Sequence, residues 1–208
     1  METKSVFLEQ WLGHCLVLIK KYKWIILGVV LIFSVVAFVE LAMGRLLLGP
    51  DGMFGLWEGN IWTSEQSQRF ADPYSFSHII HGMIFYGILW LFLRKLPIRY
   101  RFLIAIAAEA CWEMLENSPL IINRYRAVTI SIGYVGDSVL NSLSDILMVA
   151  IGFFMAMRMR TRVIVALIII IEVFTLIWVR DNLTLNVIML LYPIKAIKAW
   201  QSVGHVIP

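Results

Sequence analysis

Cysteine and charge are both scarce in this sequence. Its 208 residues include two cysteines, Cys15 and Cys111, and only 15% of all residues are charged. Two cysteines without a CxxC spacing predict neither a disulfide framework nor a thiolate zinc site. Soluble domains carry about 25% charged residues, so a large soluble domain is excluded. The basic residues form short clusters between apolar runs, which argues against nucleic-acid binding despite the net charge of +4.

Apolar residues take the place of the missing charge. They make up 60% of the chain, and the mean hydropathy is +0.80. A membrane-spanning helix needs about 20 mostly apolar residues. We therefore expect an all-α, polytopic membrane bundle that forms a single domain, 1–208, with about five transmembrane helices. The expected spans are 24–48, 75–93, 102–118, 137–157 and 163–179.

Lysine and arginine cluster on one side of this topology. They end the first segment, 1–23, and fill the short turns at 94–101 and 158–162. Such clusters mark the cytoplasmic side, so the N-terminus is expected to be cytoplasmic. Residues 1–23 then form a cytoplasmic amphipathic segment. The tail, 180–208, is periplasmic and interfacial, because its apolar piece is too short to cross.

Ionisable residues of three expected spans fall at one depth, in the outer half of the membrane. Such residues are costly in hydrocarbon and usually face a bundle interior. Glu109, Glu113 and Glu116 share one helix face, because their spacing is i, i+4, i+7. We expect them to meet two further groups in one pocket on the periplasmic side. Those groups are the pair His78 and His81 and the stripe Asp137, Asn141 and Asp145, with Glu172 as an added contributor.

The residue types in this pocket suggest chemistry. One interpretation is a divalent metal such as zinc, held by His78 and His81 with Glu113 and Asp137. The alternative is a protein-only hydrogen-bond network in which some acids are protonated. The expected catalytic residues are Glu113, Glu116, Asp137, Asn141 and Asp145. The expected binding residues for a substrate phosphate or carboxylate are Arg124, Arg126 and Arg180.

Several long motifs resemble a known family. They include Ser-Glu-Gln-Ser at 64–67 and the stretches 72–82, 109–119, 136–145 and 180–186. Over roughly residues 55–200 the chain resembles the bacterial inner-membrane proteins grouped as uncharacterised protein family 0314, or domain of unknown function 2585. The resemblance implies a multi-pass protein of the bacterial cell inner membrane and no established activity. A fainter resemblance is to VanZ-like membrane proteins.

These features lead to one expected function and two alternatives. The expected function is a membrane-embedded hydrolase or transferase that acts on a lipid or lipid-linked substrate from the outer leaflet. The first alternative is a transporter or an ion or proton pathway, although the sequence has no inverted repeat. The second is a non-catalytic membrane factor that binds a lipid or a partner. The lipid bilayer is the expected partner, and no oligomeric state is indicated.

Overall fold

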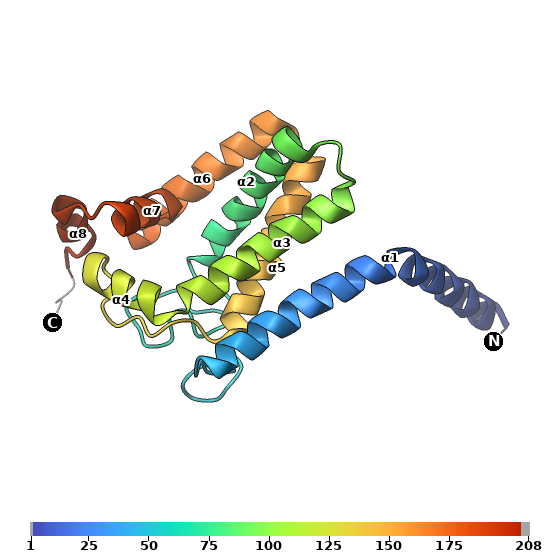
Figure 1. Cartoon of the computed structure of the whole chain (residues 1–208), viewed down its shortest axis with the longest axis horizontal. Coiled ribbons are helices and arrows are strands. Elements are labelled where there is room, and N and C mark those ends of the chain that lie inside the picture. Colours follow the sequence, from blue (N-terminus) through green and yellow to red (C-terminus); the bar gives the residue numbers. More distant parts are fainter. Residues whose placement is uncertain (1, 205–208) are drawn as a thin grey trace.

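The computed structural model describes residues 2–204, with side chains for residue 17 and from residue 20 onward. This part of the chain forms eight helices and no strands (Figure 1). The expectation of an all-α bundle is confirmed. The helices are α1 (Glu2–Ala42), α2 (Ser75–Leu93), α3 (Ile98–Glu116), α4 (Pro119–Val128), α5 (Val139–Arg158), α6 (Thr161–Val179), α7 (Leu183–Leu191) and α8 (Lys195–Gln201).

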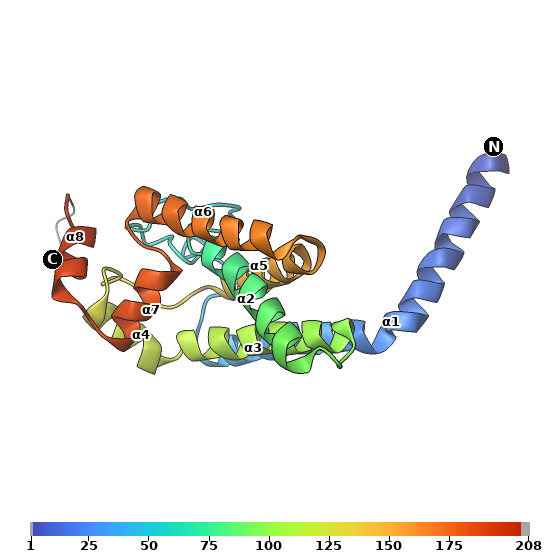
Figure 2. The same cartoon turned by 90° about the horizontal axis from the view of Figure 1, so that it is seen from above.

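The first helix, α1, is continuous from the expected amphipathic segment into the first span, and its N-terminal part projects away from the bundle (Figure 2). It ends at Ala42, six residues before the expected boundary. Gly44 follows with a φ of 81°, and the Arg45 amide donates to the Glu40 carbonyl at 2.9 Å. This glycine and this bond form a Schellman-type helix end. The side chain of Cys15 lies outside the described part.

Helix α5 lies at the centre of the bundle and contacts α1, α2, α3 and α6. Its Ile146 packs with α1 and α3, and its Phe153 packs with α2 and α3. The contact with α2 is made by backbone. A methyl group added at Gly82 would overlap the Val149 carbonyl, and one added at Gly152 would overlap the Ile79 carbonyl. Small residues allow this close approach between membrane helices.

Four helical segments are long and apolar enough to cross a membrane: Lys20–Ala42 of α1, α2, α5 and α6. The remaining expected span, 102–118, corresponds to α3, which is also 19 residues long. It does not meet the same criterion within the described residues. Two arginines near its start, Arg99 and Arg101, and three glutamates make it too polar. Its polar face is covered by α2 and α5 rather than by lipid.

Turns at one end of the bundle bring distant segments together. Pro119 occupies the first turn of α4 and keeps Ser118 extended, so α3 stops and α4 starts in a new direction. The segment 43–74 wraps around the start of α5. There the amides of Ser138 and Val139 donate to the carbonyls of Ser67 and Leu46, both at 2.9 Å. The connection between the expected spans 102–118 and 137–157 is partly helical, because α4 occupies 119–128.

Candidate functional site

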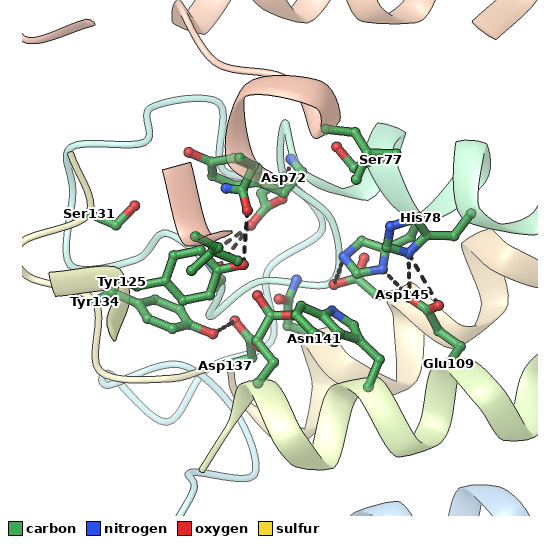
Figure 3. Close-up of a pocket in the computed structure, with 18 of the residues that line it drawn as sticks. Asp72, Ser77, His78, Glu109, Tyr125, Ser131, Tyr134, Asp137, Asn141 and Asp145 are labelled. Atoms are coloured by element: carbon green, nitrogen blue, oxygen red, sulfur yellow. Dashed lines mark hydrogen bonds and ion pairs between the residues drawn. The ribbon is translucent and has the colours of Figure 1, made fainter. Parts of the chain in front are cut away.

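Polar side chains of α2, α3 and α5 surround a cavity of about 310 Å³ at one end of the bundle (Figure 3). We call this cavity and the polar groups around it the chamber. His78 and His81 come from the first turns of α2, the glutamates from the last turns of α3, and Asn141 and Asp145 from the start of α5. Other lining residues come from the loops and from α4 and α7: Gln66, Ser67, Asp72, Tyr74, Tyr125, Ser131, Tyr134, Asp137, Leu183, Asn186, Val187 and Leu190.

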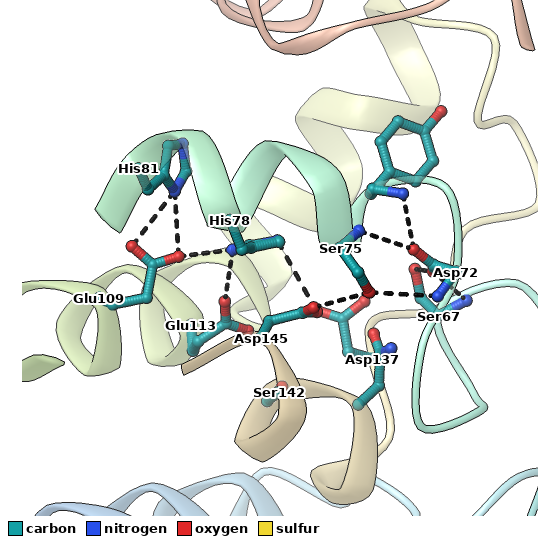
Figure 4. Close-up of polar contacts among 12 residues, drawn as sticks. Ser67, Asp72, Ser75, His78, His81, Glu109, Glu113, Asp137, Ser142 and Asp145 are labelled. Atoms are coloured by element: carbon teal, nitrogen blue, oxygen red, sulfur yellow. Dashed lines mark hydrogen bonds and ion pairs between the residues drawn. The ribbon is translucent and has the colours of Figure 1, made fainter. Parts of the chain in front are cut away.

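Glu109 binds both histidines of α2. Its Oε1 lies 2.5 Å from His78 Nδ1 and 3.0 Å from His81 Nδ1. Glu109 is fully buried and His78 is 8% exposed. Buried charges are stable only when they are paired, so the carboxylate fixes the orientation of both rings. With Nδ1 directed at Glu109, the second nitrogen of His78, Nε2, faces Asp145 Oδ2 at 3.7 Å (Figure 4).

A second set of bonds connects Asp145 to the segment before α2. The Ser75 hydroxyl donates to Asp145 Oδ1 at 3.0 Å and accepts from the Asp72 amide at 3.1 Å. Asp72 in turn accepts from the amides of Tyr74 at 2.7 Å and Ser75 at 3.2 Å, as an Asx turn does. Burial raises the pKa of Asp72 above its ordinary value, and these amide donors partly offset the effect. Asp145 Oδ2 has no role in this set.

Asn117 joins the end of α3 to the start of α5. Its Nδ2 donates to Asp137 Oδ2 and Ser142 Oγ, both at 3.1 Å, and its Oδ1 accepts from the Asp137 amide at 2.6 Å. The other carboxylate oxygen of Asp137 accepts from the Tyr134 hydroxyl at 2.9 Å. Gly136, with a φ of 92°, allows the chain to turn so closely against Asn117. Asp137 is thereby held in one orientation.

Three overlapping groups of acids and histidines have a geometry that suits a metal ion. They are His78 with His81 and Glu109, His78 with Glu113 and Asp145, and Glu113 with Glu116 and Asp137. Within each group the ligand atoms lie within 4.8 Å of one another. Glu113 belongs to two of the groups. Its side chain is 1% exposed, and its Oε1 has no hydrogen-bond partner among the described residues.

The three arginines expected to bind an anion are not among the residues that line the cavity. Each donates to a backbone carbonyl: Arg124 to Leu190, Arg126 to Tyr134 and Arg180 to Val203. These bonds hold the loops and the C-terminal helices in place. Asn141, expected among the catalytic residues, lines the cavity while its amide donates to the Arg69 carbonyl at 2.8 Å.

One wall of the cavity is apolar and comes from α7. Leu183, Val187 and Leu190 face the polar helices across the cavity. Helix α7 is positioned by Glu172, whose two carboxylate oxygens accept from the amides of Leu183 and Thr184 at 3.1 Å. Glu172, expected to contribute to the pocket, is absent from its lining and stabilises the start of α7 instead.

Sequence reasoning gave too little weight to several members of this site. Glu109 was grouped with the other glutamates but received no catalytic or ligand role, although it contacts both histidines. Asn117 and Tyr134 were also missed. The adjacency of Asn117 to the glutamate face was a usable signal. No local pattern predicts that the Tyr134 hydroxyl reaches Asp137, because both residues lie in an irregular loop.

Together these features define an α-helical membrane protein with a buried histidine–carboxylate chamber between α2, α3 and α5. The profile of a family described as "Protein of unknown function (DUF2585)" matches residues 40–203, so the chain belongs to that family. The resemblance of the motifs to uncharacterised protein family 0314 is thereby confirmed. No solved structure matches the chain.

Proteins of other bacteria are similar over most of their length. The chain is 52% identical to a UPF0314 protein of Sphingopyxis alaskensis over 171 residues, which are 82% of this chain and 91% of that protein. It is 50% identical to one of Rhizobium etli over 163 residues, 78% of this chain and 84% of that protein. It is 46% identical to one of Paracoccus denitrificans over 172 residues, 83% and 89% of the two chains.

Proposed function

We propose that this protein is a membrane-embedded hydrolase or transferase for a lipid or lipid-linked substrate. The observation that carries the proposal is the chamber itself. Two histidines of α2 and five carboxylates line one cavity, and the carboxylates are Asp72, Glu109, Glu116, Asp137 and Asp145. Ionisable groups inside a membrane domain are costly and usually serve a function. A structural role alone would need far fewer of them.

Hydrolysis or transfer needs a base, an acid and an oriented acceptor. In the proposed reaction a carboxylate takes a proton from water or from an acceptor hydroxyl. The oxygen of that water or hydroxyl attacks the ester or phosphoester centre. The bond to the leaving oxygen breaks, and a protonated carboxyl or imidazolium group gives that oxygen a proton. Asp137 and Glu116 line the cavity and suit these steps. A divalent metal would serve the same chemistry by activating the attacking oxygen.

The walls of the cavity support an amphiphilic substrate. The polar side suits a head group, and the α7 side chains Leu183, Val187 and Leu190 suit an acyl or polyprenyl chain. Four spans embed the site in a bilayer, so the substrate would enter laterally from the lipid. The distribution of lysine and arginine favours the periplasmic side of a bacterial inner membrane for the chamber. Of the three arginines expected to bind an anion, Arg126 is the exposed one, and we assign the anionic head group to it.

The test is a product search with matched variants. Full-length protein is placed in vesicles made from a total bacterial lipid extract, and lipids are compared by mass spectrometry before and after incubation. Glu113→Gln and Asp137→Asn are expected to abolish turnover while the protein still elutes as a single helical species. The control is Glu58→Gln, which makes the same change at a loop carboxylate outside the cavity.

Three results would contradict the proposal. One is equal turnover by wild type and by both chamber variants. Another is cation or proton flux across the same vesicles that needs Glu113 and Asp137 without any change in the lipids, which would favour a transporter. The third is binding of a lipid without turnover, which would favour a non-catalytic factor.

A further inference from the structure

We propose that the chamber holds two divalent metal ions that share Glu113 as a bridging ligand. This inference rests on the proposed function and names the cofactor of the same site. One ion would be bound by His78, Glu113 and Asp145, and the other by Glu113, Glu116 and Asp137 (Figure 4). The two groups have Glu113 in common, and a carboxylate has one oxygen for each of two ions.

The unpartnered oxygen of Glu113 points to a ligand that the protein does not supply. Oε1 is buried and has no hydrogen-bond partner among the described residues, and His78 Nδ1, which lies 3.5 Å away, bonds Glu109 instead. A buried carboxylate oxygen without a partner is strongly unfavourable. Metal coordination removes that cost. A buried acid of this cluster does not need a metal when the protein supplies donors. Asp72 is such a case, because its carboxylate accepts hydrogen bonds from backbone amides.

Charge decides between one ion and two. The proposed ligands include four carboxylates, those of Glu113, Glu116, Asp137 and Asp145, which carry four negative charges when ionised. Two divalent ions balance this charge, whereas one ion leaves two negative charges in a buried site. Glu109 does not enter the count, because it is paired with His78 and His81.

In the group of His78, Glu113 and Asp145, the neighbouring bonds leave one ligand atom of His78 and one of Asp145 free for coordination. Glu109 takes Nδ1 of His78 and leaves Nε2, which lies 3.7 Å from Asp145 Oδ2. That separation is too long for a hydrogen bond and close to the roughly 3.4 Å between tetrahedral ligands on bonds of about 2.1 Å. Ser75 takes Oδ1 of Asp145 and leaves Oδ2. A histidine whose other nitrogen is bound to a carboxylate is the usual arrangement in metal sites.

The ligand set indicates the class of metal. One imidazole nitrogen and otherwise carboxylate oxygens favour hard or borderline ions such as Mn²⁺, Fe²⁺, Mg²⁺ or Zn²⁺ rather than copper. His81 belongs to neither of the two groups that share Glu113, and its Nδ1 lies 3.0 and 3.2 Å from the two oxygens of Glu109. This differs from the expectation that both histidines bind the metal. Glu109 is a positioning residue for His78.

Manganese is a suitable probe because its electron paramagnetic resonance reports its neighbours. Full-length protein in detergent is stripped with chelator, titrated with MnCl₂ and examined for bound metal and for its spectrum. The wild type is expected to bind two Mn²⁺ per chain and to give the spectrum of an exchange-coupled pair. Asp145→Asn and Glu116→Gln should each bind one uncoupled ion. Glu113→Gln should bind none, and Glu58→Gln should match the wild type.

The number of ions bound by the wild type decides the proposal even where a variant does not fold. Zero or one Mn²⁺ per chain, or a Glu113→Gln protein that still binds a coupled pair, would overturn it. Its failure can be told from failure of the proposed function. Lipid turnover by metal-free protein would contradict the proposed metal pair and support the proposed enzyme. A coupled metal pair in a protein without lipid turnover would support the metal pair and contradict the enzyme.

Discussion

Helices α5 and α6 are neighbours of nearly equal length, 20 and 19 residues, yet they have opposite surroundings. In α5, 56% of the span is buried inside the protein, whereas in α6 the share is 11%. The first half of α5 carries Asn141, Ser144 and Asp145, all at most 3% exposed. The only carboxylate of α6, Glu172, lies near its end and binds α7. Thus α5 is surrounded by protein and can carry polar chemistry, whereas α6 mainly faces lipid.

The largest difference in stability between substitutions in the two helices is expected when side-chain volume is added to α5. Gly152→Val in α5 would bring a side chain into the Ile79 carbonyl. Backbone atoms of α2 cannot move aside, so we expect a loss of more than about 3 kcal/mol in the free energy of unfolding. Ile170→Val in α6, at a position that is 60% exposed, should change it by less than about 0.5 kcal/mol. Unfolding in mixed detergent micelles measures both. Equal losses would mean that α2 and α5 are not in backbone contact.

A smaller effect is expected from pH at the end of α6. Burial raises the pKa of Asp181 from 3.8 to about 6, and the Asn182 amide and the Tyr74 hydroxyl partly offset the rise. The folded chain therefore holds this proton more tightly than the unfolded chain. The resulting stabilisation, on the order of 2–3 kcal/mol, is complete below about pH 4 and is lost as the pH rises through 6.

Asp181→Asn isolates that contribution. The variant has no carboxyl at this position, so the difference in stability between wild type and variant should change between pH 4 and 6 and stay constant above pH 7. The other buried acids titrate in both proteins and cancel in the difference. Thermal unfolding at several pH values is the measurement. A constant difference across the range would show that Asp181 titrates normally in the folded chain.

The smallest effect is expected at Glu172, the exception within α6. Glu172→Gln keeps one carbonyl oxygen but loses the second acceptor and the charge at the start of α7. We expect about 1 kcal/mol of local destabilisation, which is about fivefold faster hydrogen exchange at the amides of Leu183 and Thr184. The amides of α5 should be unaffected. Faster exchange in α5 as well would mean that α6 and α7 support the chamber more directly than their burial indicates.

The sequence was sufficient to predict the helices and much of the chamber. Helical spacing puts Glu109, Glu113 and Glu116 on one face whatever the loops do, and topology puts the histidines of α2 at the same level. The arginines could not be predicted in this way. Arg124 and Arg126 lie in α4 and Arg180 follows α6, and each donates to a backbone carbonyl of a segment distant from its own helix turn. Only the folded chain reveals that these carbonyls bind the guanidinium groups.

The limits of the prediction at α4 have a local cause. No helix is predicted between the expected spans 102–118 and 137–157, whereas Pro119 starts a helix that runs to Val128. Proline in the first turn of a helix is a known start signal, but a proline after an apolar span equally marks the end of that span. Tyr125 of this helix reaches the cavity and donates to Asn186 of α7 at 3.0 Å. Because Pro119 was not identified as a helix start, α4 and its contribution to the cavity were not predicted.

The contact at Gly82 and Gly152 has a consequence for selectivity. The two glycines have hydrogen atoms in place of side chains at this contact. The separation of α2 and α5 therefore cannot change through a change of side-chain rotamer. Two sides of the chamber therefore keep a fixed width for every guest molecule. On the sides formed by α2 and α5, the backbone would limit the size of a bound molecule. Space for a larger molecule would have to come from the opposite side of the cavity.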